Sequence, residues 1–110
     1  MIASEIKIKP LSVNEAYRRK RYKTVKYKVY EEELLYKLPN LKIDKESKLF
    51  LTIVAGLSNR NADLSNIIKP FEDVLQIKYN FNDNKIYKID MTKEIVKKGK
   101  EFIRFNLDSL

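Results

Sequence analysis

With 110 residues, 44% of them hydrophobic and 35% charged, the chain is long enough for one domain with a modest core and too apolar to be disordered. It contains no Cys and no His, which excludes disulfides and thiolate zinc sites, so any metal would be a hard ion such as Mg²⁺ or Mn²⁺ bound by Asp or Glu. The formal net charge of +8 suits a polyanionic partner, although many small basic proteins carry such a charge and bind nothing in particular.

The first third of the chain predicts an edge strand, a loop and a helix. Residues 6–9 alternate Ile with Lys and end at Pro10, which favours a strand at the edge of a sheet. Residues 11–25 show no apolar period and are interpreted as a loop, whereas residues 26–38 have a helical pattern that ends at Pro39. The buried face expected for this helix consists of Val29, Tyr30, Leu34, Leu35 and Leu38.

The N-terminal segment does not look like a secretory signal, because charged residues interrupt its isoleucines. Elsewhere no uncharged apolar run is long enough for a membrane span. We therefore expect a cytoplasmic protein with no membrane partner.

The middle of the chain predicts a central strand and then an amphipathic helix. Residues 49–55 are almost wholly apolar and rich in β-branched side chains, which is typical of a strand covered on both faces. Across residues 64–75 the apolar side chains recur at helical spacing. Since proline is tolerated near a helix start, Pro70 favours a helix that begins near Asn66.

The last third predicts a turn and two strands. Residues 80–84 are rich in Asn and Asp and indicate a turn. Strands follow around residues 87–91 and 103–107, and the chain reverses between them near residues 97–100. The order β-α-β-α-β-β predicts one α+β domain over residues 1–110, with helices packed on a mixed sheet.

Two Asp residues stand where rigid scaffolds commonly hold metal-binding carboxylates. Asp63 lies between the predicted central strand and the amphipathic helix, and Asp83 lies in the turn before the next strand. A Mg²⁺ ion used for phosphodiester hydrolysis needs one or two such carboxylates. On the helix, Asn66, Lys69 and Asp73 are three and four residues apart, so they would present an amide, an ammonium and a carboxylate on one face.

Ordinary structural roles explain the same residues, and on spacing alone they explain them better. Asp63 fits the N-cap of the helix. Lys69 and Asp73 fit an i,i+4 ion pair. Asp83 between asparagines fits turn chemistry.

A family resemblance adds weight to the functional interpretation. The run Asp63-Leu64-Ser65-Asn66-Ile67-Ile68-Lys69, then Asp73 and Leu75, then Asn82-Asp83-Asn84-Lys85-Ile86, resembles the signature of the RusA family of Holliday-junction resolvases. That signature reads approximately D-x-D-N-x-x-K, then D-x-L, then D-D-x-Q followed by Ile or Val. The opening Pro10-Leu11-Ser12-Val13-Asn14, with Tyr17 and Arg18 after it, also resembles the opening of the family, so the similarity covers nearly the whole chain.

The resemblance implies a homodimeric, Mg²⁺-dependent endonuclease that resolves four-way DNA junctions by paired symmetric nicks. Members are typically encoded by phages and prophages, which implies the host cytoplasm. Asp63 and Asp83 match the metal carboxylates of the family and Lys69 its essential lysine, while Asn66 and Asp73 match supporting positions.

Two positions depart from the family pattern. Ser65 stands where the family has its second metal-binding Asp, and Asn82 stands where many members have the first Asp of the turn. Ser65 can offer Mg²⁺ a neutral hydroxyl, but the site loses one negative charge. Either a weakened enzyme or a catalytically silent module that binds junctions or proteins fits these departures.

A basic, tyrosine-rich segment supports either outcome. Its cations can neutralise phosphates, and its tyrosines can stack on unpaired bases or pack on the core. The candidate nucleic-acid-binding residues are Asn14, Tyr17, Arg18, Arg19, Lys20, Arg21, Tyr22, Lys23, Lys26 and Lys28. A third interpretation, a basic structural or ribosome-associated protein, predicts no preference for junctions over duplex DNA.

Overall fold

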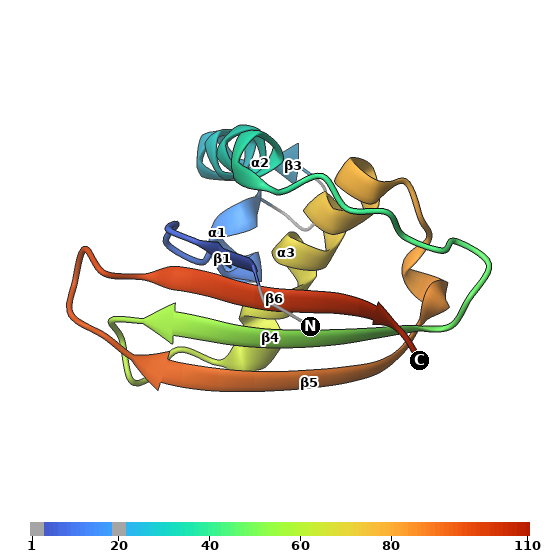
Figure 1. Cartoon of the computed structure of the whole chain (residues 1–110). Coiled ribbons are helices and arrows are strands. Elements are labelled where there is room, and N and C mark those ends of the chain that lie inside the picture. The colour runs from blue at the N-terminus through green and yellow to red at the C-terminus, as the bar shows by residue number, and fades with distance from the viewer. Residues whose placement is uncertain (1–3, 19–21) are drawn as a thin grey trace.

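A computed structural model describes residues 4–18 and 22–110 of the chain as one α+β domain (Figure 1). The main sheet has the strand order β1-β6-β4-β5 and consists of β1 (Ser4–Ile6), β4 (Leu49–Leu57), β5 (Ile86–Ile95) and β6 (Phe102–Ser109). The helices are α1 (Val13–Ala16), α2 (Val25–Lys37) and α3 (Leu64–Tyr79). The smaller elements are the antiparallel pair β2 (Tyr17–Arg18) and β3 (Tyr22–Lys23), and the 3-10 helix η1 (Asp83–Lys85). The predicted α+β class with a mixed sheet is confirmed.

The core lies between the sheet and the helices, all of which cover one face of it (Figure 1). β4 runs parallel to β5 and antiparallel to β6, so it is an inner strand. Its residues Leu49, Leu51 and Ile53 are buried on the helix side. On the same side Phe105 of β6 meets Phe71 of α3 edge to face, with ring centroids 5.4 Å apart.

The prediction that the central strand is covered on both faces is wrong for the part of the chain that the structure describes. Alternate residues of β4, namely Phe50, Thr52 and Val54, are only half-buried, because no helix packs on that side. The apolar run had suggested burial on both faces, but the neighbouring strands alone give these side chains their partial cover.

The second helix is confirmed with bounds one residue earlier than predicted, and its predicted face is confirmed at Tyr30, Leu34 and Leu38 but not at Val29. Tyr27, Tyr30 and Leu34 are buried, whereas Val29 is 56% exposed. The spacing of three and four residues is the same in both versions, so the choice of face depended on tertiary contacts that the periodicity does not carry.

The segment predicted as a loop, residues 11–25, contains α1, the β2–β3 pair and the first residue of α2. Ser12 caps α1 by accepting a hydrogen bond from the Glu15 N–H at 3.3 Å. Thr24 caps α2 in the same way through the Tyr27 N–H at 3.2 Å. Elements this short have no measurable period, so the loop interpretation missed them.

The third helix begins at Leu64 rather than near Asn66, which places Pro70 inside the helix instead of in its first turn. Pro70 lacks an N–H to donate to the Asn66 carbonyl, yet it is buried, and its packing offsets that loss. The helix ends at Asn80, whose φ of 53° is left-handed, as predicted for an Asn-rich turn. None of the helices in the described ranges is long and apolar enough to cross a membrane.

Candidate functional site

Three residues of the predicted site meet beside the middle of α3. The Lys69 Nζ lies 2.9 Å from the Asp73 Oδ1, one helical turn further along α3. The same nitrogen lies 3.6 Å from the Asp83 Oδ2, which comes from η1, after the chain has turned back alongside the helix. Residues from the helix motif and from the turn motif of the resemblance therefore meet at the Lys69 ammonium group. We call Lys69, Asp73 and Asp83 the lysine cluster.

Two further side chains hold this cluster in place. The Tyr17 hydroxyl donates to the Asp73 Oδ2 at 3.2 Å. The Gln76 amide donates to the Asp73 Oδ1 at 3.4 Å, and its oxygen accepts the Asp83 N–H at 3.0 Å. Gln76 thus ties η1 to α3, a role that the sequence interpretation missed. Its spacing of three residues from Asp73 on the same helix face is the signal that could have found it.

The charges of the cluster act on one another through partly exposed space. A hydrogen bond to Asp73 raises the pKa of Lys69, and the charges of Asp73, Asp83 and Glu72 add to that effect. Burial raises the pKa of the neighbouring Glu72 carboxyl, with Lys69 lowering it and the two aspartates raising it further. Lys69 is therefore a cation at neutral pH, so it can stabilise negative charge but cannot accept a proton.

The remaining predicted site residues lie at the start of α3. Asp63 is the N-cap residue by position, but its side chain makes no capping hydrogen bond. It lines a cavity of about 370 Å³ together with Asn66 and, from α1, Asn14 and Glu15. Ser65 is exposed on the first turn of the helix. The structure thus brings Asp63, Asn66 and Asn14 around one cavity and places Lys69, Asp73 and Asp83 in a separate cluster.

A metal ion fits this arrangement only in part. Within residues 4–18 and 22–110 there is no group of three or more acidic side chains that could hold one. Asp83 is already paired with the Lys69 ammonium, which would compete with a metal for that carboxylate. Binding of Mg²⁺ or Mn²⁺ by Asp63, Ser65 and Asp83 stays a prediction.

The basic segment divides into parts with different surroundings. Arg19, Lys20 and Arg21 lie outside the described residues, as does the side chain of Arg18. Tyr22 is 66% exposed, in keeping with a stacking role. Tyr17 is half-buried, and its ring packs edge to face on Tyr27 with centroids 5.3 Å apart, so in this arrangement it supports Asp73 instead of facing solvent.

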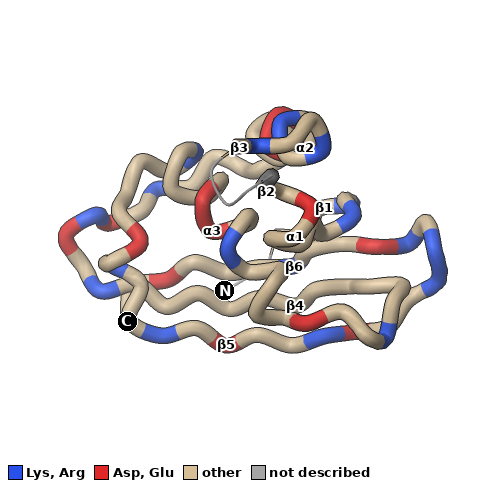
Figure 2. The backbone as a smooth tube through the Cα atoms, turned by 180° about the vertical axis from the view of Figure 1, so that it is seen from behind, with Lys and Arg blue, Asp and Glu red and all other residues tan. Residues whose placement is uncertain are grey.

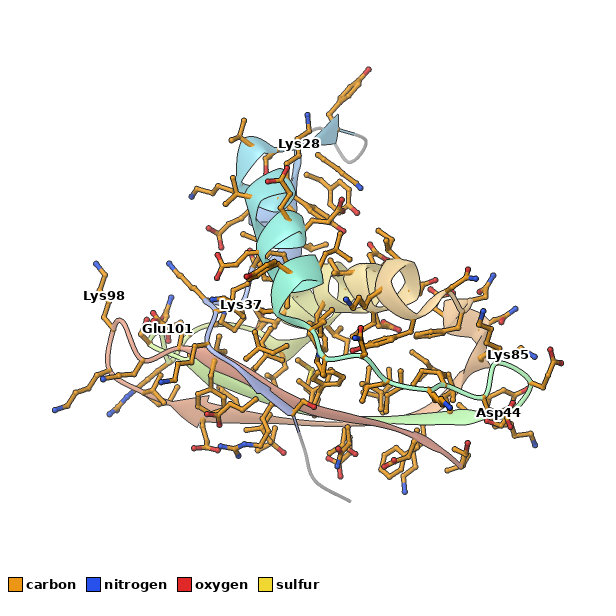
Figure 3. The ribbon with its side chains drawn as sticks, turned by 45° about the horizontal axis from the view of Figure 1, so that its top comes forward. Lys28, Lys37, Asp44, Lys85, Lys98 and Glu101 are labelled. Atoms are coloured by element: carbon orange, nitrogen blue, oxygen red, sulfur yellow. The ribbon has the colours of Figure 1, made fainter. Side chains whose placement is uncertain are left out.

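The lysines of this segment that the structure describes, Lys23, Lys26 and Lys28, lie at the surface. Lys23 pairs with Glu31 at 3.1 Å, and Lys26 pairs with Glu15 at 3.4 Å. Lys28 is exposed near the end of α2 that lies away from the sheet (Figure 3). A second cavity of about 910 Å³ is lined by Asn14, Glu15, Tyr22, Lys23, Thr24, Val25 and Lys26. It shares Asn14 and Glu15 with the cavity at Asp63, so the two hollows adjoin.

Comparison with models of known protein families gives no match, and comparison with curated proteins gives none either. What the site does is therefore argued from its own geometry together with the motif resemblance.

Proposed function

We propose that this protein is a Mg²⁺-dependent, structure-selective endonuclease that binds four-way DNA junctions as a homodimer and resolves them by paired symmetric nicks. One observation carries the proposal: Lys69 and Asp83, which stand at two separate motifs of the resemblance, lie 3.6 Å apart. A chance likeness between short motifs gives no reason for their residues to meet in the fold. The cavity beside Asp63 that is lined by Tyr22, Lys23 and Lys26 offers two ammonium groups to a phosphodiester, each of them now paired with a glutamate.

The residues of the lysine cluster have distinct roles in this proposal. Lys69, fixed by Asp73 and through it by Tyr17, stabilises the negative charge that develops on the phosphate. Asp63 and the Ser65 hydroxyl would hold the ion at the start of α3, and Asp83 would join them only by leaving its ion pair with Lys69. Mg²⁺ when bound lowers the pKa of an attacking water. Asn66 and Asn14, on the wall of the smaller cavity, offer amides to the DNA.

Cleavage of a synthetic four-way junction tests the proposal. With Mg²⁺ or Mn²⁺ present we expect wild-type protein to nick the junction in opposed strands. Asp83→Asn removes the charge but keeps the shape, and should slow cutting by about 100-fold or more. Asp44→Asn, in the exposed loop before β4 and outside the lysine cluster, removes the same charge from the same end of the sheet (Figure 3), and as the matched control it should cut at the wild-type rate. Equal cutting by wild type and Asp83→Asn would exclude the proposed site.

A second candidate function is a RusA-like module that binds junctions, or another protein, without cutting. The observation that favours it is the Ser in place of Asp at position 65, on a helix whose described surroundings supply no third acidic ligand. Ser65→Asp separates the two candidates. If wild type binds but does not cut and Ser65→Asp cuts, the protein is a silent relative. If both stay inactive, the serine is not the only defect.

Junction binding itself needs its own measurement, because a basic structural protein would also bind DNA. We expect a labelled four-way junction to be displaced by unlabelled junction at much lower concentration than by duplex of equal charge. The competition is carried out near physiological salt, where non-specific binding is weak. Equal displacement by both would support the structural interpretation.

A further inference from the structure

The reversal between β5 and β6 is a tight, lysine-rich turn. The Lys100 N–H donates to the Lys97 carbonyl at 2.9 Å, which closes a four-residue turn over Lys97, Lys98, Gly99 and Lys100. Gly99 has a φ of 93°, the conformation that the third position of a type II turn requires and that glycine adopts at no steric cost. The Gly99 N–H also donates to the Glu101 Oε1 at 2.8 Å. The backbone is therefore fixed, and we call residues 97–100 the lysine turn.

The three cations of the lysine turn face solvent. In the parts of the chain that the structure describes, no ion pair or hydrogen bond engages the side chain of Lys97, Lys98 or Lys100. Lys98 extends away from the body of the molecule (Figure 3). By contrast Lys93, a little earlier on β5, donates to the carbonyls of Arg60 and Ala62 at 2.9 and 3.0 Å. Three like charges on one turn repel each other, so folding alone gives no reason to place them together.

The opposite end of the sheet shows that this clustering is local. The loop between α2 and β4 also carries exposed lysines, but acidic residues alternate with them, as the mixed blue and red of Figure 2 shows. Its charged residues in order are Lys42, Asp44, Lys45, Glu46 and Lys48. A general excess of lysine would load both ends alike, whereas only the lysine turn keeps one sign.

The lysine turn stands at the end of a polar path across the molecule. The cavity with Tyr22 and Lys26 adjoins the cavity at Asp63 through Asn14 and Glu15. The latter cavity reaches Lys9 and Glu101, at the base of the lysine turn. The charged residues of its walls are Lys9 and the acidic Glu15, Asp63 and Glu101. Glu15 pairs with Lys26 at 3.4 Å, and Glu101 accepts hydrogen bonds from the Ser58 hydroxyl at 2.9 Å and from the Gly99 N–H.

We infer that the lysine turn is a second phosphate-binding element. It would bind the backbone of a DNA arm that lies along the two adjoining cavities and extends past Glu101. The inference rests on the proposed function, because it takes the partner to be branched DNA, and it adds a contact surface outside both the motif residues and the basic segment. A rigid backbone with three mobile ammonium groups suits phosphates, since it gives charge neutralisation without base readout. The expected contribution is therefore independent of DNA sequence.

Salt dependence of binding tests the inference. The triple variant Lys97→Gln, Lys98→Gln, Lys100→Gln is compared with Lys42→Gln, Lys45→Gln, Lys48→Gln, which removes the same charge from the other end of the sheet. Binding of a fluorescent four-way junction is titrated at several salt concentrations. We expect the slope of log K against log salt to fall by about 2 to 3 for the lysine-turn variant, with affinity lower by on the order of tenfold at low salt. The control variant should stay near wild type.

Each outcome decides one point. If wild type binds the junction and both variants weaken it equally, net charge alone acts and the inference is overturned while the proposed function stands. If the lysine-turn variant binds like wild type, the inference is overturned in the same way. If wild type does not bind DNA, the proposed function fails and the inference with it. Binding of phosphatidylserine vesicles is measured with the same variants. If the lysine-turn variant loses vesicle binding but binds the junction like wild type, the inference is overturned and the lysine turn is assigned to a membrane surface. Circular dichroism melts confirm that both variants are folded.

Discussion

The middle of α3 and its N-terminal end carry similar polar residues, but these residues differ in how many hydrogen bonds and ion pairs they make within the protein. In the lysine cluster Asp73 contacts Lys69, Tyr17 and Gln76, and Asp83 is held through its own N–H. At the N-terminal end, Asp63 makes no capping hydrogen bond and lines a cavity. Polar groups that are satisfied within the protein stabilise it, whereas groups left facing a cavity are available to a ligand. In the middle of the helix the polar groups are therefore held in place by one another, whereas at its start they face a cavity and have no such support.

The largest expected difference between these regions is in stability. Asp73→Ala removes the acceptor of the Tyr17 hydroxyl and one acceptor each of Lys69 and Gln76, which keep Asp83 and the Glu72 carbonyl. It should lower the free energy of unfolding by about 1–2 kcal/mol. Asp63→Ala should change it by less than about 0.5 kcal/mol, because no capping bond is lost. Urea unfolding followed by circular dichroism measures both. A cost for Asp63→Ala as large as that for Asp73→Ala would show that Asp63 does cap the helix, and would remove the contrast.

The sequence carried enough information for the elements with a clear period. β4 was predicted from its continuous apolar, β-branched run, β6 from apolar side chains at every second residue, and most of α3 from apolar spacing of three and four residues. Pro70 shifted the predicted start of α3, since the packing that keeps a proline inside a helix is a tertiary effect. The face of α2 was predicted except at one place, where Tyr27 is buried and Val29 is exposed, and this choice also depends on tertiary contacts.

The candidate site could be predicted only residue by residue. Lys69 with Asp73 follows from helical spacing, whereas only the resemblance assigned Lys69 and Asp83 to the same site, and their ion pair was not predicted. The hydrogen bond from Tyr17 joins segments that are distant in the sequence, and nothing local signals it. The separation of Asp63 from the lysine cluster was likewise hidden, because a motif written in letters does not state which of its residues point along the helix and which into a cavity.

A smaller effect tests whether Tyr17 belongs to the lysine cluster. Tyr17→Phe keeps the ring packed on Tyr27 but removes the donor to Asp73, and should cost about 1 kcal/mol in the free energy of unfolding. Tyr36→Phe is the matched control, since Tyr36 is 90% exposed and should lose almost nothing. Urea unfolding of both variants gives the comparison. If Tyr17→Phe unfolds like wild type and instead weakens junction binding, the hydroxyl serves the DNA, as the sequence had suggested for this tyrosine.

The smallest effect concerns Glu72, which lies beside Asp73 on α3 and whose ionised form is disfavoured by folding. Burial, with Asp83 and Asp73 adding to it, raises the pKa of Glu72 in the folded protein. The unfolded chain has the ordinary value of about 4.3, so above that pH the unfolded state ionises first and stability falls until the folded pKa is passed. Glu72→Gln should therefore be more stable than wild type at pH 7 and equal to it near pH 4.

Urea unfolding of wild type and Glu72→Gln at the two pH values measures this gain, with Glu46→Gln in the exposed α2–β4 loop as the control that should show none. Lys69 acts against the expected gain, because its charge favours the ionised carboxyl and lowers the pKa that burial raises. The Lys69 ammonium is paired with Asp73 at 2.9 Å, however, and the effect of desolvation on the pKa of Glu72 is larger than the effect of Lys69. If Glu72→Gln proved less stable than wild type at pH 7, Lys69 would be binding Glu72 more strongly than Asp73. Glu72 would then belong to the lysine cluster as a partner of Lys69.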